Sequence, residues 1–267
     1  MTNEIEKRKL QNTILIIAQE IHKICEENNI EYFMDGGTQL GAIRHGGFIP
    51  WDDDFDIGMK REEYERFIRV CDMVLDKTKF YLETCEDSGY GFSFSKIHLN
   101  GTAIIENFSQ EANVHHGIFV DIFPYDNLPD SKIKRRLFLL ENHILKNLIW
   151  VKAGYGGQKQ RKKVSYLFFK FVGKPFSINK MKALREHLIR KYNNLKTYQC
   201  FTSDYPYNFL KSEWLNNRKK YSFENCLFWG LKDYDVFLQT LYGDYMTLPP
   251  EEKRKVHSNC KIDFGLY

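Results

Sequence analysis

The sequence has no long apolar run and no paired cysteines, and each absence excludes a class of protein. Its longest apolar stretches are "ILIIA" at 14–18 and "YLFFKFVG" at 166–173, which Lys170 interrupts. A bilayer-spanning helix needs about 20 apolar residues. The start of the chain mixes charged with apolar side chains, unlike a signal peptide. We therefore expect a soluble, cytoplasmic protein.

The six cysteines are scattered, and no two of them form a C-x-x-C pair. Zinc sites and the disulfide frameworks of small secreted domains depend on closely spaced cysteines. We expect neither, and we interpret the cysteines as free thiols that are mostly buried. They are Cys25, Cys71, Cys85, Cys200, Cys226 and Cys260.

Hydrophobic content is ample for a folded core. The chain has 267 residues, 43% hydrophobic and 15% aromatic, with no internal repeat or low-complexity tract. A chain of this size can form one domain, or one domain with a large appendage. The fold class we expect is α+β (α/β), a mixed β-sheet core flanked by helices. The apolar periodicity predicts helices at 4–29, 38–45 and 61–75, and strands at 30–34, 55–59, 80–85, 90–99, 102–108 and 117–125.

Charge is distributed unevenly along the chain. Residues 132–174 contain twelve Lys and Arg but a single acid, Glu141, so this segment carries +11, whereas the whole chain carries only +4. Near residue 130 the pattern changes from strands to basic, aromatic-rich helices. We expect a core at 1–130, a basic helical segment at 131–200 and a C-terminal segment at 201–267 that packs back on the core.

A run of acidic residues lies within "DGGTQLGAIRHGGFIPWDDDFDIGM" at 35–59. If this run is extended, Asp54 and Asp56 share one face about 7 Å apart, and Asp53 points to the other face. Carboxylates so close together repel one another unless a cation neutralises them. With oxygen ligands alone, the expected cation is Mg²⁺ or Mn²⁺, and a pair of such ions is the usual arrangement for phosphoryl displacement.

Two other interpretations of the acidic run remain open. The first is an acidic surface turn, although Phe55, Ile57 and Met59 predict a buried face that a solvated turn would not need. The second is a calcium-binding loop, because four acids have its spacing, but Ile57 occupies the position at which that loop requires glycine. The four acids are Asp52, Asp54, Asp56 and Glu63.

A further carboxylate, Asp121, lies inside the apolar stretch "GIFVDIFPY" at 117–125. A buried carboxylate without a partner costs several kcal/mol or becomes protonated. One explanation is a salt-bridged or hydrogen-bonded core aspartate. The other is a neighbouring strand that brings Asp121 beside Asp54 and Asp56, as a metal ligand or as the base that deprotonates an attacking hydroxyl.

Two glycines precede a predicted helix. Gly36 and Gly37 would let backbone N–H groups approach an anion closely, and the helix dipole would favour negative charge there. A Gly-Gly pair alone is weak evidence, since most such pairs form turns. Followed by Asp-x-Asp on a strand, the pair becomes a more specific sign of a phosphate site.

The order Gly36-Gly37-Thr38, Asp54-Phe55-Asp56 and Asp121 is similar to the G-[GS]…[DE]-h-[DE]-h…[DE] signature of the nucleotidyltransferase superfamily. Longer stretches closely resemble the LicD family, whose relatives include fukutin and fukutin-related protein. The resemblance covers almost the full chain, is weakest at 131–200, and implies a nucleotidyltransferase-like core. The stretches are "DGGTQLGAIRHGGFIPWDDDFDIGM", "SKIHLNGT", "GIFVDIFPYD" and "YGDYMTLPPEEKRKVH".

The resemblance also implies roles for individual residues, with Mg²⁺ or Mn²⁺, as two ions, for a cofactor. The positions that match the family's catalytic, metal-binding carboxylates are Asp54, Asp56 and Asp121. The positions that match its phosphate-contacting turn are Gly36, Gly37 and Thr38. Further expected contacts to the diphosphate, in matching motifs, are Lys96, Arg254 and His257.

The activity that the resemblance implies is transfer of a phospho-alcohol from a CDP-activated donor to a glycan hydroxyl, with release of CMP. Bacterial LicD proteins use CDP-choline and act on a teichoic acid precursor or lipopolysaccharide, whereas the eukaryotic relatives use CDP-ribitol. Two alternatives stay open. One is nucleotidyl transfer with release of pyrophosphate, and the other is a glycosyltransferase that binds its metal through Asp-Phe-Asp.

Aromatic and basic residues suggest the remaining contacts. Choline carries a quaternary ammonium, which proteins hold against aromatic faces, and the candidates are Trp51, Tyr90, Phe94 and Tyr125. The basic segment predicts contact with an anionic membrane surface, at its inner face, where a lipid-linked glycan acceptor would be presented. A solvated basic face is the alternative, and no recognised motif supports nucleic acid. The aromatics of that segment are Trp150, Tyr155, Tyr166, Phe168 and Phe169.

Overall fold

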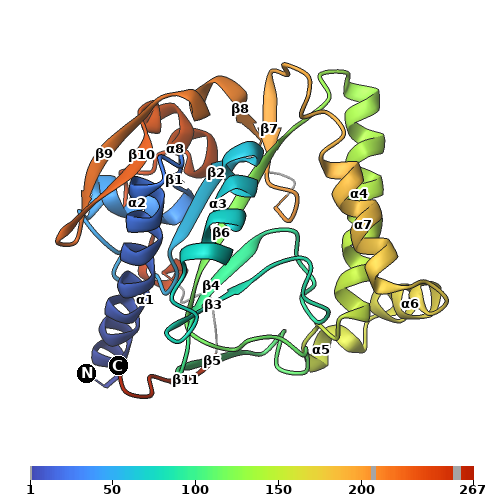
Figure 1. Cartoon of the computed structure of the whole chain (residues 1–267), viewed down its shortest axis with the longest axis horizontal. Helices are drawn as coiled ribbons and strands as arrows, with labels where there is room; N and C mark the ends of the chain where they lie inside the picture. Colours follow the sequence, from blue (N-terminus) through green and yellow to red (C-terminus); the bar gives the residue numbers. More distant parts are fainter. Residues whose placement is uncertain (1, 206–208, 255–259) are drawn as a thin grey trace.

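The computed structural model describes residues 2–205, 209–254 and 260–267 (Figure 1). The helices are α1 (Thr2–Glu27), α2 (Gly36–Arg44), α3 (Arg61–Val74), α4 (Lys132–Lys152), α5 (Gln158–Arg161), α6 (Val164–Gly173), α7 (Ile178–Ile189) and α8 (Tyr234–Tyr242), with 3-10 turns η1 (Ser212–Asn216) and η2 (Glu251–Lys253). The strands are β1 (Phe33–Met34), β2 (Asp56–Lys60), β3 (Phe80–Glu83), β4 (Ser95–Leu99), β5 (Ala103–Glu106), β6 (Phe119–Asn127), β7 (Gln199–Phe201), β8 (Leu210–Lys211), β9 (Arg218–Phe223), β10 (Cys226–Leu231) and β11 (Cys260–Asp263).

The central sheet has the strand order β1-β2-β6-β4-β3, and β7 pairs with the end of β6 and with β8. β2 and β6 are parallel, and the other neighbouring strands are antiparallel. α1 and α3 contact each other and both contact β6, so they cover one face of the sheet (Figure 1). The expected mixed sheet flanked by helices is confirmed.

The first helix forms because its apolar residues recur every three or four positions. Ile14, Ile17 and Ile21 lie on one face and are buried in the main core cluster. Burying each such side chain stabilises the fold by about 1.5–3 kcal/mol. The helix was expected at 4–29 and ends two residues earlier, where Asn29 takes a positive φ of 52° that asparagine tolerates.

Several strands are shorter than the apolar pattern predicts. The strand expected at 90–99 begins only at Ser95, because Tyr90 and Phe94 turn into a second buried cluster instead of continuing the alternation. The strand expected at 102–108 is present as β5, but it pairs with β11 and not with the central sheet. Long-range packing, which local pattern does not report, decides both outcomes.

Helices α4 to α7, here called the basic arm, lie at one side of the molecule, far from α1 (Figure 1). α4 packs against both α6 and α7. A buried cluster of Leu128, Phe138, Leu188 and Phe201 joins the arm to the end of the sheet. The guanidinium of Arg61 on α3 donates to Asp126 on β6 at 2.8 Å, and both side chains are buried. Arg61 also pairs with Glu186 on α7 at 3.6 Å, so this ion pair and the buried cluster attach the arm to the sheet.

The part of the chain after residue 211 returns to the N-terminal elements. The β9–β10 hairpin contacts β1 and α2, and α8 packs against α2. Among the helices in the described ranges, none is long and apolar enough to span a bilayer. Cys25, Cys71, Cys85, Cys200 and Cys226 are free thiols.

Candidate active site

The parallel pair β2 and β6 forms the floor of a cleft of about 620 Å³. Asp56 on β2 is the register partner of Asp121 on β6, so the two side chains rise from neighbouring strands at the same level. Both line the cleft together with Asp54. The predicted juxtaposition of Asp121 and Asp56 on neighbouring strands is confirmed.

The N-terminus of α2 forms one wall of the cleft. Asp35 caps this helix, because its carboxylate accepts a hydrogen bond from the Gly36 N–H at 2.8 Å and a second from the Tyr125 hydroxyl at 2.7 Å. Gly36 has a φ of +46°, a backbone angle that residues other than glycine rarely adopt. A Cβ atom on Gly37 would lie 3.0 Å from Oδ2 of Asp52. The glycine pair thus allows α2 to begin beside the carboxylates.

Thr38 has a structural contact behind this wall. Its hydroxyl accepts a hydrogen bond from the backbone N–H of Asp56 at 2.8 Å, and the Asp35 N–H donates to the Asp56 carbonyl at 3.0 Å. Gly36 and Gly37 line the cleft, whereas the buried Thr38 does not belong to the lining residues of the described chain. Thr38 therefore holds α2 against β2.

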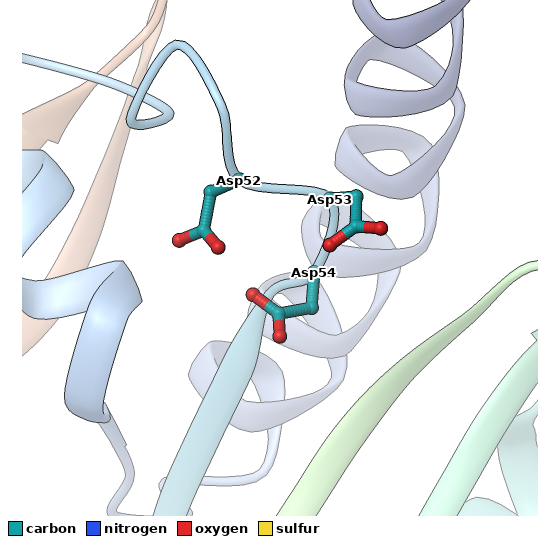
Figure 2. Close-up of side chains that lie close together, drawn as sticks. All are labelled: Asp52, Asp53 and Asp54. Carbon is teal, nitrogen blue, oxygen red and sulfur yellow. The ribbon is translucent and has the colours of Figure 1, made fainter. Parts of the chain in front are cut away.

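Asp52, Asp53 and Asp54 lie on the loop that leads into β2 (Figure 2). One carboxylate oxygen of each lies within 4.8 Å of the others. Asp52, Asp54 and Asp56 line the cleft and Asp53 does not belong to its described lining, which agrees with the prediction that Asp53 points away from their face, although β2 begins only at Asp56. Gln11 on α1 fixes the loop by donating to the Asp52 carbonyl at 2.9 Å.

Burial raises the pKa values of three carboxylates in the cleft, Asp35, Asp56 and Asp121. Burial, followed by the charges of Asp54 and Asp121, raises the pKa of Asp56 well above its usual range. Burial raises the pKa of Asp35 to about 6, although its hydrogen bonds to Tyr125 and Gly36 oppose the shift. So much negative charge inside one cleft calls for a compensating cation.

Lys96 is the cation that the fold itself places beside Asp121. It is the register partner of Asp121 across β4 and β6, and its Nζ lies 2.5 Å from Oδ1 of Asp121. Burial raises the pKa of Asp121, and Lys96 opposes that shift. Lys96 does not belong to the described residues that line the cleft. Lys96 thus neutralises the Asp121 carboxylate, and its expected contact with a diphosphate stays a prediction.

Two arginines, Arg44 and Arg254, lie beside the half-buried Trp51, at a part of the cleft here called its rim. The guanidinium carbons of Arg44 and Arg254 lie 6.0 Å and 5.0 Å from the indole centroid. Arg44 was not predicted, although it follows Gly37 by two helical turns and so shares the face of α2 that lines the cleft. Arg254 lies beside Trp51 and does not belong to the described lining of the cleft, so its expected contact with the diphosphate stays a prediction, and His257 lies outside the described residues.

The wall opposite α2 contains Thr202 and Tyr205, on the loop after β7. Buried cations of the basic arm hold this loop: Arg185 on α7 donates to Oδ1 of Asp204 at 3.0 Å, and Lys146 on α4 donates to the Asp204 carbonyl. Within the described chain, the buried Thr202 hydroxyl has no hydrogen-bond partner, which leaves it able to bind a ligand group. No sequence signal marks this wall, because partners from three separate segments create it.

The aromatic residues of the cleft differ in part from those expected. Trp51 and Tyr125 line it as predicted, but Tyr90 and Phe94 are buried in the core and do not. The remaining aromatic rings of the lining come from β6, from the loop after β7 and from α8 and the turn after it. They are Phe123, Tyr205, Tyr242 and Tyr245.

The donor set suits a hard divalent cation. The cleft offers carboxylate oxygens, the ligands that Mg²⁺ and Mn²⁺ prefer. The calcium-loop interpretation is wrong, because Asp56 begins a strand and Glu63 lies on α3, where it accepts a hydrogen bond from the Glu31 N–H. The surface-turn interpretation is also wrong, since Asp52 and Asp53 are each only 7% exposed.

Comparison with known proteins identifies the family and the relatives that this chain resembles. The family model described as "LicD/FKTN/FKRP, nucleotidyltransferase domain" matches residues 29–143. The chain is 31% identical to "Lipopolysaccharide cholinephosphotransferase LicD" of Haemophilus influenzae over 262 residues, which cover 94% of this chain and 95% of that protein. It is 41% identical to "Ribitol 5-phosphate transferase FKRP" of Homo sapiens over 46 residues, 17% of this chain and 9% of that protein.

Proposed function

The chain belongs to the LicD family, and from this membership and the carboxylate-lined cleft we propose that it transfers a phospho-alcohol to a hydroxyl group of a glycan. The donor in this proposal is a CDP-alcohol, with CDP-choline as the first choice, and the leaving group is CMP. The single observation that carries the proposal is the register pairing of Asp56 with Asp121 directly beside the glycine-led N-terminus of α2.

In the proposed reaction, Asp54, Asp56 and Asp121 hold Mg²⁺ or Mn²⁺, as two ions. When bound, such ions neutralise phosphate charge and make the acceptor hydroxyl more acidic. The crowding of buried carboxylates described above supports this assignment, since the folded chain alone offers one buried cation, Lys96, next to them in the described structure.

Residues of the chain position the reacting groups. The backbone N–H of Gly37 at the start of α2 faces the donor phosphates, which the positive end of the α2 dipole favours, while the Gly36 N–H donates to the capping Asp35 carboxylate. Arg44 and Arg254 supply positive charge at the rim, and Trp51 beside them offers an aromatic face. The donor is thereby oriented with its leaving CMP toward α2 and the rim.

The chemical step is an in-line displacement at phosphorus. Asp121 accepts the proton of the acceptor hydroxyl, the hydroxyl oxygen forms a bond to the phosphorus that carries the alcohol, and the bond from that phosphorus to CMP breaks. Lys96 favours the ionised form of Asp121 and so keeps it able to accept the proton. Positioning and electrostatics supply most of the rate enhancement in such reactions.

The acceptor in this proposal is a cell-surface glycan precursor, a lipopolysaccharide or a teichoic acid, in a lipid-linked form. The relative in Haemophilus influenzae carries lipopolysaccharide in its name, which supports the first of these. We place the reaction at the cytoplasmic face of the membrane, with the protein as a peripheral partner of that surface and no nucleic acid involved.

The released nucleotide tests the proposal. The protein is incubated with Mg²⁺ or Mn²⁺, a glycan acceptor and, in separate reactions, CDP-choline, CDP-ribitol, nucleoside triphosphates or UDP-sugars. Acceptor-dependent release of CMP from a CDP-alcohol is the expected result. Pyrophosphate from a triphosphate would instead identify a nucleotidyltransferase, and UDP would identify a glycosyltransferase.

A further inference from the structure

Helix α6 has two apolar faces, of which only one is covered. Its inner face carries Tyr166 and Phe169, and Phe169 packs with Leu148 and Ile149 of α4. Its outer face carries large apolar side chains at i, i+3, i+4 and i+7 spacing, all of them strongly exposed. These are Val164, Leu167, Phe168 and Phe171, exposed by 83%, 52%, 59% and 79%.

The exposed apolar surface continues along α4. Four side chains one helical turn apart form a stripe on this helix, each at least 41% exposed. Leu148, one turn after the last of them, is covered by α6 and lies 3.3 Å from where a Cβ atom on Gly173 would be. α6 therefore sits on the same side of α4 as the stripe. The stripe is Ile133, Leu137, Leu140 and Ile144.

A surface of this kind needs an occupant. Exposed apolar side chains are common singly, but a contiguous group of them marks a protein or membrane interface. Figure 1 shows that α6 projects from the side of the arm, away from the central sheet. The face is thus accessible to a large partner.

The charge around this face indicates which kind of partner can bind there. Lys163, Lys170 and Lys174 follow one another at spacings of seven and four, so they form a row along one flank of the apolar face of α6. They belong to the segment 132–174, which carries +11. A second copy of the chain would set +11 against +11 across a self-complementary contact, which is repulsive. An anionic lipid surface is complementary to both the charge and the apolar face.

The structure also corrects which residues the basic segment offers. Tyr155 and Tyr166 were expected at the anionic partner but are buried, and Trp150 is half-buried. The guanidinium of Arg161 is held by the carbonyls of Gly154 and Gly156. The exposed groups include the outer face of α6, its lysine row, and Lys159 and Lys162.

We propose that the exposed faces of α6 and α4 bind an anionic phospholipid bilayer. The apolar side chains of α6 enter the boundary between head groups and acyl chains, and its lysine row contacts the lipid phosphates. This inference rests on exposure and charge, and it holds whether or not the proposed reaction is correct.

Flotation of the full chain with lipid vesicles tests the proposal. We expect binding to phosphatidylcholine vesicles that contain phosphatidylglycerol, and little binding to phosphatidylcholine alone. The variant Lys163→Gln/Lys170→Gln/Lys174→Gln should weaken binding on the order of 100-fold at low salt. Phe168→Ser/Phe171→Ser should weaken it at least about tenfold at any salt concentration, because insertion is not screened.

Matched controls separate this surface from general stickiness. Lys23→Gln/Lys219→Gln/Lys232→Gln removes the same charge from exposed lysines elsewhere and should bind like the wild type. Met73→Ser removes an apolar side chain exposed by 75% on α3, and should also leave binding unchanged. The Asp56→Asn variant should bind vesicles normally, which separates this inference from the catalytic one.

Three results would overturn the proposal. The first is equal binding to neutral and anionic vesicles, and the second is unchanged binding by both arm variants. The third is a wild-type dimer in sedimentation experiments, together with a monomer for Phe168→Ser/Phe171→Ser. The last result would identify a second copy of the chain as the occupant. Circular dichroism of each variant confirms that the fold is retained, as expected for exposed positions.

Discussion

The cleft and the basic arm carry opposite charges and hold them in opposite ways. In the cleft, Asp56 and Asp121 are set side by side by strand register, burial raises the pKa of both, and the charges of Asp54 and Asp121 raise the pKa of Asp56 further. In the arm, most lysines lie on exposed helix faces, where water and salt screen them. Each charge in the cleft therefore destabilises the fold unless a specific partner neutralises it, whereas a charge on the surface of the arm has little effect on stability and can be replaced.

One part of the arm does not follow this rule. Arg185 on α7 is 1% exposed and forms a buried ion pair with Asp204, on the loop that forms a cleft wall. Asn142 on α4 donates to the Ser203 carbonyl of the same loop at 2.8 Å. The arm therefore has an outer, basic surface and an inner surface that supports the cleft.

The largest expected effect comes from the cleft floor. Asp56→Asn should lower kcat/KM by roughly 10³-fold or more, because a carboxylate that binds cation and phosphate is lost. In metal-free buffer the same variant should raise the free energy of unfolding by about 1 kcal/mol, because a buried charge beside Asp54 and Asp121 is removed. Turnover assays and denaturant titrations measure the two effects. The exposed Asp72→Asn is the matched control, and near-normal turnover of Asp56→Asn would refute the assignment.

The second effect concerns the inner surface of the arm. Arg185→Met should lower the free energy of unfolding by about 3–5 kcal/mol, because Asp204 would be left buried without its partner. It should also raise KM, since the wall with Tyr205 loses its support. Arg190→Met, which breaks exposed ion pairs on the same helix end, should cost less than about 1 kcal/mol.

A double variant checks that interpretation. Adding Asp204→Asn to Arg185→Met removes the buried charge that Arg185→Met leaves without a partner. The double variant should therefore lose less free energy of unfolding than the sum of the losses in the two single variants. Strict additivity, measured by denaturant unfolding, would show that the two side chains do not act as a pair.

The third effect is stabilisation by metal. At a hundred times its dissociation constant, Mg²⁺ should raise the free energy of unfolding by about 2.7 kcal/mol. The gain should be smaller in Asp56→Asn and unchanged in the arm variant Lys163→Gln/Lys170→Gln/Lys174→Gln. Thermal unfolding with Mg²⁺ and with EDTA measures it, and an equal gain in Asp56→Asn would place the cation elsewhere.

A smaller effect concerns His115, behind the cleft. Burial and the neighbouring His98 lower the pKa of His115 to about 4, and its Nδ1 accepts a hydrogen bond from the Gly117 N–H. The unfolded chain therefore binds more protons than the folded chain between about pH 4 and 6.5, so stability should fall as pH drops through this window. Because the side chain is half-exposed, we expect a loss of about 1 kcal/mol. In His115→Gln, the free energy of unfolding should change less with pH over this range, which denaturant titrations at several pH values measure. A pH dependence equal to that of the wild type would contradict the prediction.

The smallest effect belongs to the outer surface of the arm. Lys163→Gln/Lys170→Gln/Lys174→Gln should change kcat/KM toward a water-soluble acceptor less than about twofold, and stability by less than about 0.5 kcal/mol. A tenfold loss of turnover in this assay would mean that the arm lysines take part in the chemistry, and the contrast between the two regions would then be lost.

Local patterns predicted much of this molecule. Apolar periodicity placed α1 and α3 to within two residues of their ends, because a helix buries one face wherever its sequence repeats every 3.6 residues. The spacing of Gly36-Gly37, Asp54-x-Asp56 and Asp121 indicated a phosphate and metal site, because these residue types serve few other purposes at that spacing. Asp35 could have been added, since it occupies the capping position directly before the glycines.

Other features depended on contacts between distant segments. Lys96 meets Asp121 because β4 and β6 are antiparallel neighbours, and nothing near Lys96 in the chain specifies that register. Thr202 and Tyr205 entered the cleft through support from α4 and α7.

Sequence alone was sufficient for α1, α3, the acidic run, the glycine-led helix and the +11 segment, since each is a property of neighbouring residues. The partner of each buried charge and the exposed face of α6 emerged only from the folded chain. A buried charge is stabilised by whichever group lies a few ångströms away, and a helix face is exposed or covered according to what packs on it. Both are set by distances in space, which separation along the chain does not report.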